Sequence, residues 1–410
     1  MISLKKKSQR KFNTSRLFGK YTIFPLGKVA MYAFNLLEYV DYYLSEKPNI
    51  KVLVPEYFYS KDRPIANKYL LSLILKGFQK HKIPFTKNIV LISTIYLLNK
   101  LRIISIHGKK EANNAQEFYD KEFSVSIMPQ YATRTSAYNR DEKFCNLTKD
   151  DLNKGYKILT KNSVDIDKSI VTMHVRDNKY GAEIEQSNYG PTGGHTFRNS
   201  KVETIIKSTY EYLSDNSINL FRMGADQLQV TDALCSGKYI DYTNNFRSDF
   251  MDIFLISESK FLIGTCSGLH GIAYLFKVPI LGLNFIPIFD ATLSQRDMWM
   301  PKKIWIKNEK KFMKFSDMFS SGLMHGSISD NYLASNGLEV VDNSDEEIFN
   351  AVVEMNSLVD ANLEITDKDE WLWSRFKSIV NEKCNHSHVI LNSKSRISPK
   401  FLIQNENLLY

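Results

Sequence analysis

The sequence predicts an α/β protein built from two Rossmann-like, doubly wound domains that face a central cleft. Short apolar, β-branched runs alternate with amphipathic segments along most of the 410 residues. Several of these runs end in glycine, arginine or other polar residues, which is typical of strands that reach the ligand-binding edge of an open parallel sheet. A chain of this length also exceeds the usual size of a single hydrophobic core.

Four segments are expected along the chain. Residues 1–20 form a basic, flexible leader, residues 21–160 the first domain, and residues 161–345 the second domain. Helices and a tail occupy residues 346–410, and we expect them to cross back to the first domain.

The net charge of +9 is concentrated in part in the leader, through residues such as Lys5, Lys6 and Lys7. This excess indicates attraction to an anionic membrane surface or an anionic substrate, although a solvated leader explains it equally well. No nucleic-acid-binding module is recognisable. The four scattered cysteines form no CxxC pair and favour a reducing cytoplasm. The apolar runs at 69–75 and 89–98 are too short for a bilayer span of about 20 residues.

The first domain opens with a strand, a glycine turn and a long amphipathic helix. The expected elements are strands at 21–24 and 50–55, helices at 29–44 and 66–78, a helix or strand at 89–98, and a strand at 101–106. Gly27, in the first turn, is a candidate on the acceptor side of the cleft. The GxGxxG fingerprint of dinucleotide-binding domains is absent, which disfavours an NAD oxidoreductase.

The second domain has the more regular alternation. The expected strands are 170–175, 218–223, 238–242, 261–263 and 278–283, and the expected helices are 201–213, a segment after Arg247, and 269–276. Ser200 and Glu203 predict a capping box for the helix at 201–213. Further helices are expected at 346–359 and after a cap at Thr366.

The strand at 170–175 ends in the sharpest chemical signal, His174-Val-Arg176-Asp177. Alternation along a strand places His174 and Arg176 on one face. A guanidinium forms paired hydrogen bonds with phosphate oxygens and stays charged at cellular pH. Arg176 is therefore the candidate for holding a donor diphosphate, against the simpler alternative of an arginine that pairs with Asp177 or another acid.

Other candidate anion-binding residues recur in the same domain. The turn at 264–268 has small residues whose amides can approach phosphate or ribose. Serine and aspartate before a helix are explained equally well as caps. The full set of binding candidates is His174, Arg198, Asn199, Arg222, Gly224, Arg247, Asp249, Asp252, Gly264, Thr265, Ser267 and Gly268.

The candidates for a general base are Asp177, His195, Asp249 and a carboxylate of the first domain. The catalytic candidates are therefore Arg176, Asp177 and His195. Cys266 is better explained as a small buried residue than as a nucleophile. Asp165 and Asp167 have the spacing of a metal-binding pair but precede their strand, so no metal and no cofactor are expected.

Several of these motifs also resemble known families. His-Val-Arg-Asp, Arg-Met-Gly at 222–224, Arg-Ser-Asp-Phe-Met-Asp at 247–252, the turn at 264–268 and Arg-Ile-Ser-Pro-Lys-Phe-Leu at 396–402 resemble an uncharacterised bacterial glycosyltransferase family. Their order is similar to the donor domain of the α1,2-, α1,6- and protein O-fucosyltransferases. The resemblance spans most of residues 170–290 and the tail. Asp177-Asn178 departs from the fucosyltransferase pattern.

The resemblance implies a GT-B fold and an inverting, metal-independent transferase that uses a nucleotide sugar, with GDP-sugar favoured. It implies that Arg176 holds the donor β-phosphate and that Asp249, Ser267 and Gly268 line the nucleotide site. The expected acceptor is a bacterial surface glycan or lipid-linked glycan. We expect a cytoplasmic protein, peripheral to the inner membrane through its leader. The alternatives are a nucleotide-sugar epimerase and a non-catalytic nucleotide- or glycan-binding subunit.

Overall fold

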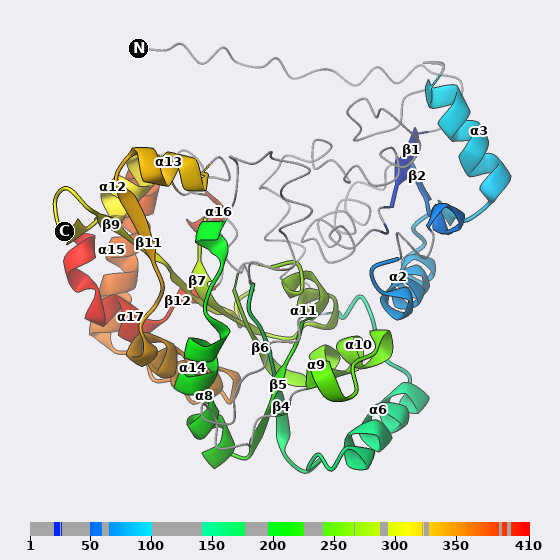
Figure 1. Cartoon of the computed structure of the whole chain (residues 1–410), viewed down its shortest axis with the longest axis horizontal. Helices are drawn as coiled ribbons and strands as arrows, with labels where there is room; N and C mark the ends of the chain where they lie inside the picture. The colour runs from blue at the N-terminus through cyan, green and yellow to red at the C-terminus, as the bar shows by residue number, and fades with distance from the viewer. Residues whose placement is uncertain are drawn as a thin grey trace.

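The computed structural model confirms the α/β class (Figure 1). It describes residues 20–24, 26, 50–59, 65–100, 142–176, 196–224, 240, 242–265, 267–287, 294–321, 323, 328–384, 388–391 and 395–410. Within this part lie a three-stranded parallel sheet, a six-stranded parallel sheet and a three-stranded antiparallel sheet. The expected helix at 29–44 and strand at 101–106 fall outside the described residues.

The smaller parallel sheet belongs to the N-terminal unit. Its strands, in spatial order, are β1 (Lys20–Ile23), β2 (Ile50–Leu53) and β3 (Phe85–Thr86). The helix α2 (Lys68–Lys80) connects β2 to β3, as a parallel βαβ unit requires. The segment at 89–98, which the sequence left open, is the helix α3 (Ile89–Lys100).

The larger sheet carries the site. All of its strands are parallel, in the order β12 (Arg396–Ile397), β8 (Met298–Pro301), β7 (Ile280–Phe285), β6 (Ser259–Gly264), β4 (Ser169–His174) and β5 (Ile218–Arg222). A parallel bridge from Phe221 to Ile240 extends the sheet beyond β5. The chain therefore moves outward from β4 in one direction and returns to β6 on the other side of β4. The carboxyl ends of β4 and β6 form the topological switch point of the sheet.

Helices lie on both faces of this sheet. The helix α8 (Val202–Asp215) follows β4, and α11 (His270–Phe276) follows β6. Right-handed crossovers that run in opposite directions along a sheet lie on opposite faces, and Figure 1 shows α8 and α11 on either side of it. The helix α14 (Asp345–Val359) packs beside α8, and α10 (Asp249–Ser257) packs beside α11.

The remaining elements surround this framework. They are η2 (Glu56–Phe58), α6 (Lys149–Lys161), η4 (Thr196–Arg198), α9 (Tyr242–Asn245), β9 (Lys303–Ile306), β10 (Lys311–Phe312), α12 (Phe315–Ser320), α13 (Asp330–Ser335), β11 (Leu338–Val341), α15 (Asp367–Lys383), α16 (His388–Leu391), α17 (Pro399–Gln404) and η7 (Glu406–Leu409). The antiparallel sheet has the order β10-β9-β11.

The C-terminal tail packs on the larger unit. β12 pairs with β8, and α17 packs against α14 and α15. Ser398 caps α17 by accepting a hydrogen bond from the Phe401 N–H, and it donates to the buried carboxylate of Glu354 at 2.5 Å. The Ser-Pro pair of the tail is thereby explained as a helix start. The expected crossing back to the first domain stays a prediction, as does the central cleft.

Two predicted helix starts have different outcomes. A capping box formed by Thr366 and Asp369 begins α15, as expected. The predicted Ser200 cap is wrong, because α8 begins after Lys201 and no side chain caps it. The backbone N–H of Ser200 instead donates to the carbonyl of Arg176 at 3.0 Å, which fixes this residue to the end of β4.

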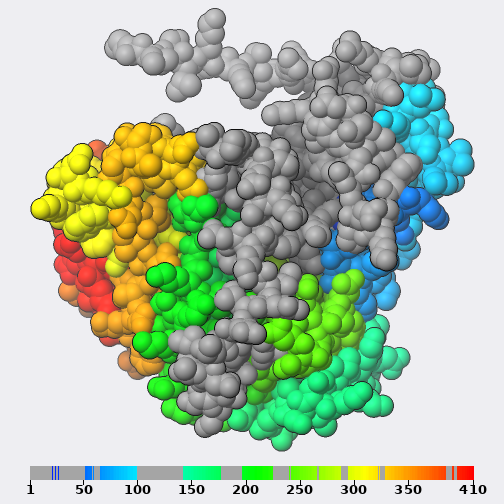
Figure 2. All heavy atoms as spheres, viewed as in Figure 1, coloured from blue at the N-terminus to red at the C-terminus, as the bar shows by residue number. Residues whose placement is uncertain are grey.

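The two units are joined through α2 and α10. Figure 2 shows α2, in blue, against the green atoms of the larger unit. The rings of Tyr69 and Phe250 meet edge to face, with centroids 5.0 Å apart. The core is continuous from Phe24 and Phe78 in the N-terminal unit to the strands of the larger sheet. No helix in the described part of the chain is both long and apolar enough to span a bilayer.

Candidate functional site at the carboxyl ends of β4 and β6

The ends of β4 and β6 are joined by three hydrogen bonds. The N–H of Arg176 donates to Thr265 Oγ1 at 2.8 Å, and the N–H of Thr265 donates to the His174 carbonyl at 3.2 Å. The side chains of His174 and Ser267 also meet, with Nδ1 and Oγ 2.9 Å apart. Four of the predicted site residues are therefore brought together at the switch point of the sheet.

The turn after β6 is tightly packed against the first residues of α11. Thr265 is fully buried and Ser267 is nearly so. A Cβ on Gly264 would lie 2.2 Å from His270 Nε2, so only glycine lets the strand pass over this imidazole. Gly268 lies two residues before α11, and its carbonyl accepts a hydrogen bond from Gly271. These contacts fix the position of the turn's backbone relative to β4.

His270 is a site residue that the sequence reasoning missed. It is fully buried and stacks on the ring of Phe285 at a centroid distance of 5.5 Å. Burial, and then the charge of His174, lower the pKa of His270 to about 3, so the imidazole is neutral at cellular pH. Its position as the first residue of α11, directly after the glycine turn, was the available signal.

The end of β5 approaches the same place. Gly224 has a φ of 140°, a conformation that favours glycine. The atom nearest to the position of a Cβ on Gly224 is His174 Cδ2, at 3.9 Å. Arg222 is almost completely buried in β5, and its carbonyl accepts a hydrogen bond from Thr243. Arg222 therefore lies within the sheet, whereas Gly224 borders the site.

The acids and the arginine around α10 have structural partners. Arg247 forms an ion pair with Asp252 at 3.3 Å, and the hydroxyl of Tyr242 donates to Asp252 Oδ1 at 2.8 Å. Burial raises the pKa of Asp252 despite the opposing charge of Arg247. The carboxylate of Asp249 accepts a hydrogen bond from the backbone N–H of Lys68. Ser248 caps α10, as the simpler explanation of this motif predicted.

Arg198 and Asn199 lie where the chain returns to β4. The N–H groups of Thr196 and Phe197 donate to the carboxylate of Asp330 at 2.9 and 3.0 Å, which fixes η4. The carbonyl of Asn199 accepts a hydrogen bond from the buried ammonium of Lys302 at 2.5 Å. Ser200, which follows Asn199, donates a hydrogen bond to the carbonyl of Arg176. Arg198 and Asn199 are therefore one or two residues away from a direct contact with the end of β4.

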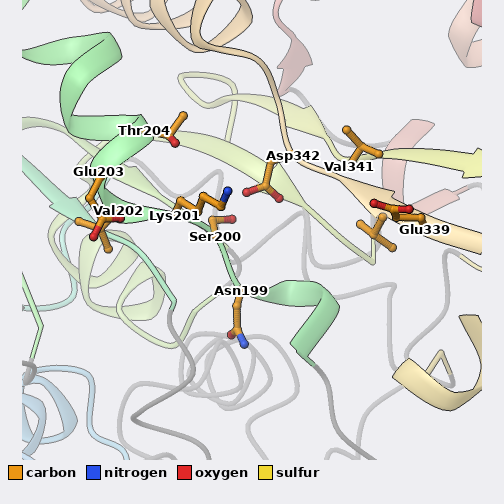
Figure 3. A pocket seen from close by; sticks show the side chains of 10 residues that line it. Asn199, Ser200, Lys201, Val202, Glu203, Thr204, Glu339, Val341 and Asp342 are labelled. Atoms are coloured by element: carbon orange, nitrogen blue, oxygen red, sulfur yellow. The ribbon is translucent and has the colours of Figure 1, made fainter. Parts of the chain in front are cut away.

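A pocket of about 640 Å³ lies beside Asn199 and Ser200 (Figure 3). Its walls are the segment that leads into α8 with the first turn of that helix, and the strand β11 with the residue that follows it. The lining residues are Asn199, Ser200, Lys201, Val202, Glu203, Thr204, Glu339, Val340, Val341 and Asp342. The carboxylate of Asp342 forms an ion pair with Lys302 at 2.7 Å. Carboxylates, hydroxyls and an amide on facing walls are suited to hydrogen bonding with hydroxyl groups.

Three predicted site residues, Gly27, Asp177 and His195, lie outside the described residues, as does Cys266. Cys145 and Cys384 are buried free thiols. Among the residues that the structure describes, no group of three His, Cys, Asp or Glu side chains is arranged to hold a metal ion.

No protein-family model matches the sequence, and no curated protein matches it. The solved structures that align with the chain include three bacterial proteins. A glycosyl transferase family 9 protein from Veillonella parvula aligns with a TM-score of 0.44 and 10% identity over 83% of this chain and 97% of its own. The E. coli ADP-heptose LPS heptosyltransferase II aligns with a TM-score of 0.37 and 11% identity, over 68% of this chain and 90% of its own. The E. coli heptosyltransferase WaaC with ADP covers the same shares, with a TM-score of 0.30 and 9% identity.

Proposed function

We propose that the protein is a glycosyltransferase of GT-B type that binds a nucleotide-sugar donor at the carboxyl ends of β4 and β6. The observation that supports this most is the set of hydrogen bonds among His174, Arg176, Thr265 and Ser267 at the switch point of a parallel sheet. Ligands of open α/β sheets bind at such points. Arginine, hydroxyls and a glycine-bordered turn are groups that suit a diphosphate.

In this proposal, the larger unit binds the donor and the N-terminal unit presents the acceptor. The guanidinium of Arg176 holds the β-phosphate and stabilises the charge that develops on the departing nucleoside diphosphate. The hydroxyl of Ser267 and the turn beside Gly268 contribute hydrogen bonds. His174, held by Ser267, lies between the turn and Gly224 and supports the same group.

The acceptor hydroxyl needs a base for direct displacement at the anomeric carbon. Asp249 is engaged with the backbone of α2, so we propose Asp177 or His195 for this role. The reaction is then inverting and uses no metal and no cofactor besides the donor. A GDP-sugar stays our first donor to test, and a bacterial surface glycan or lipid-linked glycan our acceptor class. The fucosyltransferase likeness and the inner-membrane location also stay predictions.

Nucleotide binding by Arg176→Ala is the direct test. We would measure the affinity of the purified full chain for GDP, UDP, ADP, CMP and dTDP by calorimetry, with EDTA and then with Mg²⁺. Loss of a charge-assisted pair of hydrogen bonds costs about 1.5–3 kcal/mol, so we expect Arg176→Ala to weaken the preferred nucleotide roughly 10- to 100-fold. Arg296→Ala is the matched control, because Arg296 is exposed near the amino end of β8, at the opposite edge of the sheet.

Three outcomes separate the proposal from its alternatives. Equal affinities for the wild type and Arg176→Ala would show that the diphosphate does not bind at this arginine. Conversion of the donor sugar without any acceptor would indicate an epimerase on the same scaffold. Nucleotide binding with neither transfer nor slow donor hydrolysis would indicate a binding subunit.

A further inference from the structure

The helix α3 carries apolar side chains on both its inner and its outer face. Ile92 and Ile95 are buried against Leu53 of β2, and Tyr21 of β1 packs on the same small cluster. On the outer face, Val90 is 71% exposed and Leu97 is 53% exposed. A helix on the surface of a soluble domain ordinarily places polar side chains on its outer face. The outer face of α3 therefore needs an explanation beyond packing.

The exposed apolar side chains gather around this helix. Val90 and Leu97 are seven residues apart and so lie on one helical face, and Ile89 is also exposed, at 43%. Tyr57 of η2 is 66% exposed, and the ion pair between Glu56 and Lys87 holds η2 to the residues that precede α3. Figure 2 shows α3, in cyan, at the edge of the molecule, away from the larger unit.

The N-terminal part of the sequence, to which α3 belongs, is strongly basic. The first 110 residues contain 21 Lys or Arg and five Asp or Glu, whereas the other 300 contain 33 and 40. From residue 64 to residue 110 there are nine basic residues and no acidic one. Lys80, Lys82 and Lys87 of this stretch are exposed, and Lys80 and Lys87 form ion pairs with Glu142 and Glu56. The apolar face of α3 thus lies within the basic end of a chain whose remainder is acidic.

We propose that α3 is a membrane-docking helix, with Val90, Leu97, Ile89 and Tyr57 entering the interface of an anionic phospholipid bilayer. Partial burial of such side chains in the interface, added to attraction between lysines and anionic headgroups, is the usual means by which a surface helix binds a membrane. The charge favours lipid over a second copy of this chain, because two copies would bring the same basic surfaces together. This inference extends the proposed function, since it places the acceptor-presenting unit against a bilayer that carries lipid-linked glycans.

The test is vesicle flotation with the full-length protein and no nucleotide. Vesicles contain either phosphatidylcholine alone or phosphatidylcholine with 30% phosphatidylglycerol. We expect binding to the anionic vesicles that weakens at high salt, and little binding to the neutral ones. The variant Val90→Ser/Leu97→Ser should bind anionic vesicles about ten-fold less tightly. Phe349→Ser is the matched control, because Phe349 is similarly exposed, at 44%, but lies on α14 of the larger unit.

The leader needs a separate arm, because its basic residues could attract the same lipids. A full-length variant with Lys5, Lys6, Lys7 and Arg10 changed to Gln tests it. If this variant loses vesicle binding while Val90→Ser/Leu97→Ser binds as the wild type does, the leader docks and the assignment of α3 is wrong. Equal binding to neutral vesicles would overturn the anionic partner. A dimer that Val90→Ser/Leu97→Ser makes monomeric, without vesicle binding in either form, would assign the face to a second copy.

Val90→Ser/Leu97→Ser changes exposed side chains, so its melting temperature should match that of the wild type, whereas Phe349→Ser also removes the edge-to-face contact between Phe349 and Tyr212. Nucleotide affinity, measured separately, should also be unchanged in Val90→Ser/Leu97→Ser. Failure of vesicle binding with intact nucleotide binding would overturn only the docking surface. Failure of nucleotide binding in the wild type would instead overturn the proposed function.

Discussion

The carboxylate of Asp249 accepts a hydrogen bond from the backbone N–H of Lys68, at 2.9 Å, across 181 residues of sequence. The side chain of Asn67 reinforces this contact, since Nδ2 donates to the Asp249 carbonyl at 2.8 Å and Oδ1 accepts from the Leu70 N–H at 2.7 Å. The start of α2 is thereby attached to the start of α10. Asp249, which the resemblance assigned to the nucleotide site, connects the two units.

We expect Asp249→Ala to destabilise this junction without weakening nucleotide binding. The carboxylate is exposed, so its loss should lower the free energy of unfolding by about 1 kcal/mol, as for other helix-end acceptors. Asn67→Ala should cost more, about 2 kcal/mol, because Asn67 is fully buried and makes both contacts. Urea unfolding measures both. A stable Asp249→Ala protein that no longer binds nucleotide would return Asp249 to the donor site.

Gly264→Ala should disturb the turn through His270. The new methyl group would lie 2.2 Å from Nε2, and the imidazole is held against Phe285, so neither side can yield easily. We expect a loss of stability of about 1–3 kcal/mol, as for other overpacked cores. His270→Ala in the same chain should restore part of it. If the double variant is less stable than the two single losses predict, the close contact is not the cause.

Thr265→Val should weaken the donor without unfolding the protein. Valine keeps the shape of threonine but leaves the Arg176 N–H without its acceptor, so the arginine is positioned less well. We expect nucleotide affinity to fall about five- to ten-fold, which corresponds to roughly 1 kcal/mol. Thr209→Val, in the middle of α8, removes a hydroxyl bonded only within its own helix and is the control. Equal losses in the two variants would point to a general loss of stability.

Much of the larger sheet was predictable because its strands carry their own signals. β4, β5, β6 and β7 are short apolar runs, and His174, Gly224 and Gly264 mark the ends of three of them, whereas β8 and the two-residue β12 were not predicted. Periodicity did not settle whether residues 89–98 form a helix or a strand, nor which face of α3 is buried, since apolar residues occur on both faces. Tertiary contact with β2 decides that it is a helix on the outside of the smaller sheet.

The site was predictable in its residue types and less so in their partners. A strand-end arginine and a small-residue turn can be found along the sequence, because local chemistry identifies them. The bond between Ser200 and Arg176, and the one between Asp249 and Lys68, depend on how distant segments meet. Serine and aspartate suit a helix cap, a ligand and an interdomain contact equally well. Only the fold distinguishes these roles.

We expect Asp297 to make the stability of the protein depend on pH. It is fully buried where β8 begins, and burial raises the pKa of its carboxyl from 3.8 to about 7, although the N–H groups of Ile280 and Ser294 donate to it. Between these two pH values the folded protein holds the proton more tightly than the unfolded chain does. Stability should therefore fall as the pH rises from about 4 to 7, by at most about 1.4 kcal/mol per pH unit from this group.

The variant Asp297→Asn isolates this contribution, because an amide cannot ionise. Urea unfolding at pH 5, 6, 7 and 8 should show the wild type losing stability relative to Asp297→Asn up to pH 7 and running parallel to it above. Asp317→Asn, which removes an exposed carboxylate from α12, should follow the wild type throughout. A wild type that gains stability relative to Asp297→Asn between pH 5 and 7 would mean that the buried carboxylate is ionised in the folded protein. Its hydrogen bonds from Ile280 and Ser294 would then outweigh the cost of burial.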